Sequence, residues 1–364
     1  MKPRERVIAA IQREEFDRIP LDCAFRPEVW TRLRQYFRAH DEEIVKKELG
    51  VDIREVGMDA PTGFKPTSFI PSGSKNYESF LITAFDEWGI RRKEGATGIY
   101  WHFTYHPLED ISLDEYEFPD LNAEGRFDRA KKEAKSFGQE YAVASHYTGG
   151  IFEQAWWLRG FNRFIRDLYG NPKFANDLLD RLLDWKTEQG KRIVETGVDI
   201  IKVGDDFGTQ TGMMIPPELW RRYFKHRYKR WFSDLKSAGD VYVFFHSDGK
   251  IDPIIPDLIE VGVDILNPIQ PECMDPAKLK KEYGDKLTFH GTVSVQETLP
   301  FGTVEDVREE VITRIRTLGY DGGLIVSPTH MVGTDVPIEN ILALYETARE
   351  YQHVERNREG KSRP

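Results

Sequence analysis

Short apolar runs recur along the 364-residue chain, and each run ends in polar or glycine residues before a longer amphipathic segment begins. Eight runs have the length and the β-branched or aromatic content of strands. They lie at residues 19–25, 51–57, 141–147, 199–206, 241–248, 264–270, 287–294 and 323–330. Because they are apolar almost throughout, they are typical of strands that are covered on both faces.

The segments between these runs have the pattern of helices. Residues 216–239, PPELWRRYFKHRYKRWFSDLKSAG, begin with proline and end with glycine, which are common at the first and the last position of a helix. Residues 337–351, PIENILALYETAREY, also begin with proline. Eight strands that alternate with helices favour an α/β protein, first a (β/α)8 TIM barrel and second an open doubly wound sheet.

One segment breaks the rhythm. Residues 58–140 are rich in glycine, proline, serine and aromatic residues. We expect a long insertion after the second strand, with a small hairpin of its own, which shapes a pocket or a lid at the strand ends. We expect one domain over residues 1–364, with a frayed polar tail at residues 352–364.

The composition limits the class of protein. Hydrophobic residues make up 40% and charged residues 31%, and the formal charge is 51 − 61 = −10 without a basic cluster, so nucleic acid is not an expected partner. The two cysteines, Cys23 and Cys273, are far apart, which excludes a disulfide framework and a cysteine-only zinc site. The charged N-terminus resembles neither a signal peptide nor a membrane span, so a cytoplasmic protein is expected.

Polar residues mark the ends of the predicted strands, where a barrel places its active site. The titratable ones are His146, Asp205, Asp206, His246, Asp248, His290 and His330. His246 and Asp248 are two residues apart, so they project to the same side of an extended strand. With His330 they offer two imidazoles and one carboxylate, which suit zinc or a similar divalent ion. A hydrogen-bonded pair is the alternative interpretation of the His-x-Asp motif.

Three carboxylates are candidates for acid–base chemistry or for a further metal ligand. Glu153 lies among aromatic residues in GGIFEQAWWLRG, where a raised pKa would make it a proton donor. Helix capping or pairing with Arg159 is equally compatible with this position. Of Asp205 and Asp206, we expect one to face the barrel mouth and the other to cap the helix that follows.

Candidate substrate contacts are mainly aromatic. Tyr147, Phe152, Trp156, Trp157 and Phe207 would line a cleft for a flat ring such as a methoxylated aromatic, and their alternative place is the core. His290 and Arg26 complete the predicted substrate-binding set.

Several stretches resemble the uroporphyrinogen decarboxylase superfamily. They include KPRERVIAAIQREEFDRIPLD, VGDDFGTQTGMMIPPELW, HSDG with the residues that follow it, and GGLIVSPTHMVGTDVPIENILALYETAREY. The resemblance implies a single barrel with its cleft at the carboxyl ends of the strands. It also implies one of two activities: porphyrinogen decarboxylation without a cofactor, or zinc-dependent methyl transfer to or from a corrinoid or a thiol.

The resemblance favours the methyltransferase branch. The decarboxylases carry an arginine-rich motif soon after the first strand, where this chain has Arg26 as the one early candidate. In the methyltransferases the zinc ligands are a His-x-Cys at the fifth strand and a cysteine at the eighth. His246 matches that histidine, whereas Asp248 and His330 stand where the two cysteines would be.

This departure changes the expected chemistry. Nitrogen and oxygen ligands leave an ion harder and more Lewis acidic than thiolates do, which suits an oxygen-bearing methyl donor such as a methyl ether. We therefore expect a methyltransferase that binds zinc or a similar metal and moves a methyl group from a small methylated substrate to a corrinoid protein. A cofactor-free decarboxylase and a non-catalytic binding barrel are the alternatives, and the resemblance also allows a homodimer.

Overall fold

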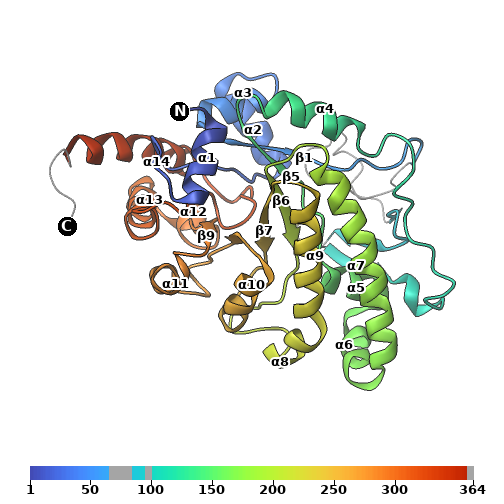
Figure 1. Cartoon of the computed structure of the whole chain (residues 1–364). Coiled ribbons are helices and arrows are strands. Elements are labelled where there is room, and N and C mark those ends of the chain that lie inside the picture. The colour runs from blue at the N-terminus through green and yellow to red at the C-terminus, as the bar shows by residue number, and fades with distance from the viewer. Residues whose placement is uncertain (65–83, 95–100, 359–364) are drawn as a thin grey trace.

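Seven parallel strands form one curled sheet in the computed structural model, which describes residues 1–64, 84–94 and 101–358. In spatial order the strands are β1 (Ile53–Val56), β5 (Ala142–Ser145), β6 (Ile200–Gly204), β7 (Tyr242–His246), β8 (Ile265–Asn267), β9 (Thr288–His290) and β10 (Leu324–Ile325). Helices surround the outer face of the sheet (Figure 1).

Residues 20–22 join the two edges of this sheet. Leu21 pairs in parallel with Val326, just beyond β10, and its carbonyl oxygen accepts a hydrogen bond from the Asp52 amide at 2.8 Å, just before β1. The first predicted strand is thus present as isolated pairings, and the seven others are regular strands. The predicted α/β barrel is confirmed.

The helices are short apart from two. They are α1 (Pro3–Gln12), α2 (Pro27–Phe37), α3 (Glu42–Leu49), α4 (Asp128–Phe137), α5 (Ile151–Arg159), α6 (Phe161–Gly170), α7 (Pro172–Val194), α8 (Pro217–Trp220), α9 (His226–Ala238), α10 (Ile255–Val261), α11 (Pro276–Tyr283), α12 (Thr298–Phe301), α13 (Val304–Leu318) and α14 (Ile338–Arg358). A π-helical turn, η3 (Arg221–Lys225), joins α8 to α9 within the predicted helix 216–239. None of the helices in the described ranges is long and apolar enough to cross a membrane.

The C-terminal segment differs in part from the expectation. We expected residues after Tyr351 to be a frayed tail, but α14 continues to Arg358, because nothing in that stretch breaks a helix. Residues 359–364 lie outside the described part of the chain.

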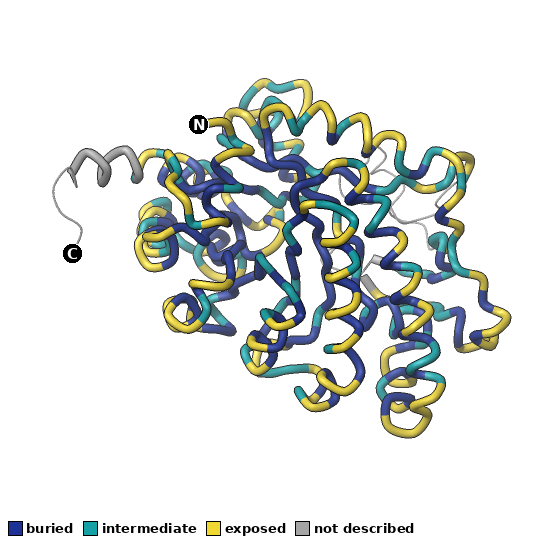
Figure 2. The backbone as a smooth tube through the Cα atoms, in the orientation of Figure 1, coloured by how far each residue is buried: buried dark blue, intermediate teal, exposed yellow. Residues whose placement is uncertain are grey.

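The barrel interior changes from apolar to polar along the strands. The lower layer lies toward the end at which the strands begin. It consists of side chains from six strands together with two from α1: Ile53, Ala142, Ala144, Ile200, Phe244, Ile265, Ile325, Val7 and Ile11. Alpha-helix α1 therefore closes the end at which the strands begin. Two residues further along their strands, Glu55, Lys202, His246 and Asn267 point to the same interior, because side chains alternate with a period of two. Figure 2 shows that the strands are buried and that the outer faces of the helices are exposed.

The insertion contains a small antiparallel sheet of β2 (Ala84–Phe85), β3 (Arg91–Glu94) and β4 (Trp101–Tyr105), so the predicted hairpin is present. A single turn of 3-10 helix, Pro107–Glu109, follows it. The sheet contacts α5, since the ring of Phe103 lies 4.9 Å from that of Trp156 and 5.6 Å from that of Trp157. Residues 65–83 and 95–100 of the expected insertion lie outside the described residues.

The closure of the barrel gives a first prediction. Asp52 is fully buried, and it accepts hydrogen bonds from the Leu21 amide (2.8 Å), from Arg18 (2.8 Å) and from Arg6 (2.5 Å). The substitution Asp52→Ala should lower the free energy of unfolding by about 3–5 kcal/mol, because Arg18 loses the carboxylate that balances its charge and Arg6 keeps only Asp17. Urea titration measures this loss.

The control is Asp177→Ala, which removes an exposed pair with Lys173 and should cost less than about 1 kcal/mol. Equal unfolding midpoints for the two variants would contradict the assigned role of Asp52.

Candidate functional site

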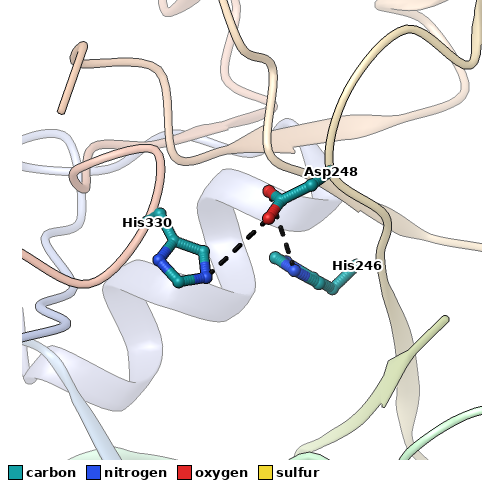
Figure 3. Close-up of side chains that lie close together, drawn as sticks. All are labelled: His246, Asp248 and His330. Carbon is teal, nitrogen blue, oxygen red and sulfur yellow. Dashed lines mark ion pairs between the residues drawn. The ribbon is translucent and has the colours of Figure 1, made fainter. Parts of the chain in front are cut away.

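His246, Asp248 and His330 meet at the rim of the barrel. His246 is the last residue of β7, Asp248 follows two residues later, and His330 lies five residues beyond the end of β10. The Nε2 atoms of both histidines lie 3.8 Å from a carboxylate oxygen of Asp248. Figure 3 shows the two rings on either side of that carboxylate. The structure thus brings together the three residues that the sequence analysis grouped.

The arrangement fits a divalent metal ion. One ligand atom from each of the three residues lies within 4.8 Å of the other two. Two ligands of a tetrahedral zinc ion, at bond lengths of roughly 2.1 Å, lie roughly 3.4 Å apart, so small side-chain shifts would suffice. The side chains of Asp248 and His330 are 38% and 44% exposed, which leaves the cluster accessible to solvent on one side. Three protein ligands with an open side are typical of catalytic metal sites.

Asp206 lies beside this cluster. Its carboxylate accepts a hydrogen bond from the Asp248 amide at 2.8 Å and lies 3.6 Å from His246 Nε2. Burial raises the pKa of the Asp206 carboxyl, although His246 opposes the shift. For His246 the balance is reversed: burial lowers its pKa, but Asp248 and Asp206 together raise it above the ordinary value. The charges of Asp206, Asp248 and His246 therefore influence one another.

Asp205 points the other way, into the core. It is fully buried and accepts hydrogen bonds from the Phe152 amide (2.8 Å), the Glu153 amide (2.7 Å) and the Tyr228 hydroxyl. Asp205 thus caps α5, the helix before it in the chain, and not the helix that follows as expected. Burial raises the pKa of Asp205 to about 7, although its three donors favour the ionised form.

The close approach of Asp205 explains the second glycine in TGGIFE, Gly150. A Cβ atom on Gly150 would lie 1.9 Å from the Asp205 carboxyl carbon, so only glycine leaves room for the capping carboxylate. Arg159 pairs with Asp167 at 2.8 Å. Both alternative roles of Glu153 are thus taken by other residues.

Glu153 lies in the first turn of α5, close to the carboxylates of Asp205 and Asp206. Burial raises its pKa well above the ordinary value, and the neighbouring Asp206 and Asp205 raise it further. A backbone hydrogen bond from Asp206 and the charge of Arg92 oppose the shift without cancelling it. Glu153 therefore keeps its proton at a pH at which an ordinary glutamate is ionised.

The predicted aromatic contacts divide into two groups. Phe152 and Phe207 are fully buried and stack at a centroid distance of 4.8 Å, so they belong to the core and not to a cleft wall. Their apolar side chains fill the space between α5 and the sheet. Tyr147 is 48% exposed, and its ring lies 5.2 Å from the ring of His246. Trp156 and Trp157 are half-buried beneath the insertion sheet.

Two further predicted contacts lie near the cluster. Arg26 is half-buried at the start of α2, and its positive charge is one of the smaller influences on His330, whose pKa is lowered mainly by burial. His290 is buried in the barrel, where its Nε2 lies 3.0 Å from Asp22. It contacts the protein interior and not the cleft.

Sequence reasoning missed a set of interior polar residues. Lys202 is buried within β6 and pairs with Glu55 and, at 3.5 Å, with Asp22. Asn267, at the end of β8, accepts a hydrogen bond from His246 Nδ1 at 2.5 Å. The sixth strand was predicted to run from 264 to 270, whereas β8 ends at Asn267, so the rule that selected residues at strand ends did not reach it.

Comparison with known proteins places this site in a family. Residues 127–351 match the family model of uroporphyrinogen decarboxylase (URO-D), a segment that contains all three cluster residues. The chain belongs to the URO-D family. Among curated members, the uroporphyrinogen decarboxylase of Chlorobaculum tepidum is 23% identical over 186 residues, which cover 50% of this chain and 51% of the relative. That of Aliivibrio salmonicida is 24% identical over 225 residues, which cover 59% of each chain.

The chain thus spans about half to three-fifths of the length of the URO-D proteins that it matches. Among solved structures, a methyltransferase from Methanosarcina mazei superposes with a TM-score of 0.71 at 19% identity, covering 96% of this chain and 99% of that one. At this identity the likeness shows a shared fold.

The two adjacent aspartates give a second prediction. Asp205→Ala should lower the free energy of unfolding by at least about 2 kcal/mol, because three buried donors lose their acceptor and α5 loses its cap. Asp206→Ala should cost less than about 1 kcal/mol, since it removes one acceptor at a half-exposed position. Urea unfolding of both variants tests the division, and a larger loss in Asp206→Ala would refute it.

Proposed function

We propose that this protein is a metal-dependent methyltransferase that takes a methyl group from a small methylated compound and passes it to a corrinoid protein. The observation that carries the proposal is the convergence of His246, Asp248 and His330, from two distant parts of the chain, at an open rim. The family membership and the fold shared with a methyltransferase support it.

The three residues would hold zinc or a similar ion through two nitrogens and one oxygen. When bound, such an ion supplies Lewis acidity at the oxygen that carries the methyl group. No cysteine belongs to the cluster, and Cys273 instead lies 3.0 Å from Gln210. Metal ligands without sulfur favour an oxygen-bearing methyl donor, such as a methyl ether, over a thiol substrate. The half-exposed ring of Tyr147, beside His246, offers a flat surface for such a compound.

Glu153 has the properties of the proton donor. In such a transfer the cobalt(I) of the partner would supply both electrons of the new bond to the methyl carbon, and the C–O bond would break with its own two electrons left on oxygen. The oxyanion then takes the proton of the Glu153 carboxyl, which its surroundings keep protonated. Asp206, whose amide donates to Glu153 and whose carboxylate lies beside His246, connects the acid to the cluster.

Decarboxylation without a metal is the second candidate, because the curated relatives are named uroporphyrinogen decarboxylases. The charges around the cluster weigh against it. Asp206 and Asp248 lie next to one another beside His246. Such a surface repels a substrate with many carboxylates.

Metal content gives the third prediction. Protein purified without chelator should contain about one zinc or similar ion per chain by plasma mass spectrometry. The double variant His246→Ala, His330→Ala should lose it, whereas His40→Ala, at an 83% exposed histidine, should keep it. Equal metal content in all three proteins would exclude the proposed ligands.

Methyl transfer itself can be followed by the absorbance of reduced cobalamin. A panel of methoxylated aromatics and methylamines should show transfer from at least one methyl ether with the wild type, and none with the double variant. Release of carbon dioxide from a porphyrinogen by metal-free protein, without methyl transfer, would instead establish the second candidate.

The protonated state of Glu153 gives the fourth prediction. An ordinary glutamate has lost its proton above roughly pH 5. Because the pKa of Glu153 is raised, the rate should stay high at neutral pH and fall as the pH rises through that pKa. The variant Glu153→Gln should lose roughly 10²–10⁴-fold in rate and should also lose this alkaline decline.

The leaving group supplies the internal control for this variant. A nitro-substituted phenyl methyl ether leaves a weakly basic oxygen and needs little protonation, so Glu153→Gln should slow it far less than an unsubstituted ether. Equal slowing of both ethers would contradict the role of Glu153 as proton donor.

A further inference from the structure

A chain of hydrogen bonds runs from the cluster into the barrel. His246 Nδ1 lies 2.5 Å from Asn267 Oδ1, and Asn267 Nδ2 lies 2.8 Å from His290 Nδ1. His290 Nε2 lies 3.0 Å from Asp22, which in turn pairs with Lys202. Asn267, His290, Asp22 and Lys202 are all buried, so water does not compete for these contacts.

One backbone atom fixes the direction of the whole chain. The Asn267 amide nitrogen also lies 3.2 Å from the carbonyl oxygen of His290, which can only accept a hydrogen bond. The atom that faces it must therefore be Nδ2, and the opposite arrangement would set two oxygens against each other. With this orientation, Oδ1 faces His246 and can only accept.

The tautomers of both histidines follow from this orientation. His246 must carry its proton on Nδ1 in order to donate to Asn267 Oδ1, which leaves the lone pair on Nε2. Asn267 Nδ2 donates its second hydrogen to His290 Nδ1, so His290 carries its proton on Nε2 and donates it to Asp22. Every member of the chain then has the donor or acceptor that it needs.

The fold places these groups in one layer. His246 and Asn267 are direct partners on β7 and β8, and the neighbouring pair Leu266 and Phe289 sets His290 beside Asn267 on β9. Gly291 leaves room for the amide, since a Cβ atom at this position would lie 2.4 Å from Asn267 Nδ2. The positive φ of Gly291 (69°) also disfavours any other residue there.

We propose that Asn267 is a positioning residue that selects the His246 tautomer and directs its Nε2 lone pair toward Asp248 and His330. The inference rests on the proposed function in one respect, namely that Nε2 binds a metal. This series of hydrogen bonds ends on the carboxylate of Asp22. Metal-binding histidines commonly donate directly to a carboxylate, but here Asn267 and His290 stand between His246 and Asp22.

Two variants separate the halves of the chain. Asn267→Leu has a similar shape and removes both hydrogen bonds, so His246 loses its imposed tautomer, whereas Asp22 still holds His290 in the Nε2–H form. Asn267→Asp still accepts from His246 but no longer donates to His290. It should leave the His246 tautomer unchanged and place a proton on His290 Nδ1 as well as on Nε2, because a carboxylate then faces each ring nitrogen of His290. The control is Asn340→Leu, which removes another buried amide, with bonds to Leu299 (2.9 Å) and Gly302 (2.8 Å).

Nitrogen-15 NMR of histidine-labelled, metal-free protein reads the tautomers directly. We expect the Nδ1–H form for His246 and the Nε2–H form for His290 in the wild type and in Asn340→Leu, with resonances assigned from single histidine variants. An Nε2–H form for His246 in the wild type would overturn the inference. So would an unchanged His290 signal in Asn267→Asp.

Zinc affinity, measured by competition with a chromophoric chelator, supplies the second readout. Asn267→Leu should bind zinc 10–100-fold more weakly than the wild type, whereas Asn267→Asp and Asn340→Leu should stay close to it. Equal affinity in Asn267→Leu would refute the positioning role. If the proposed function is wrong, the wild type should bind no zinc. The histidine tautomers of the metal-free protein would still test the positioning role of Asn267.

Discussion

A closed barrel admits one inward side chain for every two residues of each strand, and this alternation organises both the core and the site. Along the strands, the apolar lower layer that α1 covers gives way within one repeat to charged and amide side chains. Buried charge is tolerated only when it is paired. Lys202 therefore lies between Glu55 and Asp22, and His290 binds the same aspartate. The register of the sheet thus decides which polar groups can meet.

The polar layer connects a rigid interior to an open rim. Asp22 and His290 are buried, whereas Asp248 and His330 are more than one-third exposed. His246 lies between the two environments, with one ring nitrogen bonded to Asn267 and the other close to Asp248. Such a residue is oriented by buried contacts on one side and remains available for chemistry on the other, which is the arrangement that precise metal sites require.

Much of the fold was predictable because strands leave a local signal. The eight apolar runs all correspond to strands or strand pairings, and the strand-end rule selected the three residues that converge. Contacts that depend on tertiary packing were not predictable. Phe152 and Phe207 look like cleft residues in sequence, yet the packing of α5 buries them. Asp205 caps a helix that begins more than fifty residues before it in the chain. Asn267 was not predicted because the apolar run continues to residue 270, which places Asn267 within the predicted strand and not at its end.

The central claim is that two imidazoles and one carboxylate, without sulfur, surround one metal ion. X-ray absorption at the zinc K-edge of the zinc-loaded wild type tests it most directly. We expect a first shell of nitrogen and oxygen at roughly 2.0–2.2 Å, with the outer-shell scattering of two imidazole rings. A sulfur shell at roughly 2.3 Å, or scattering without imidazole, would contradict the account.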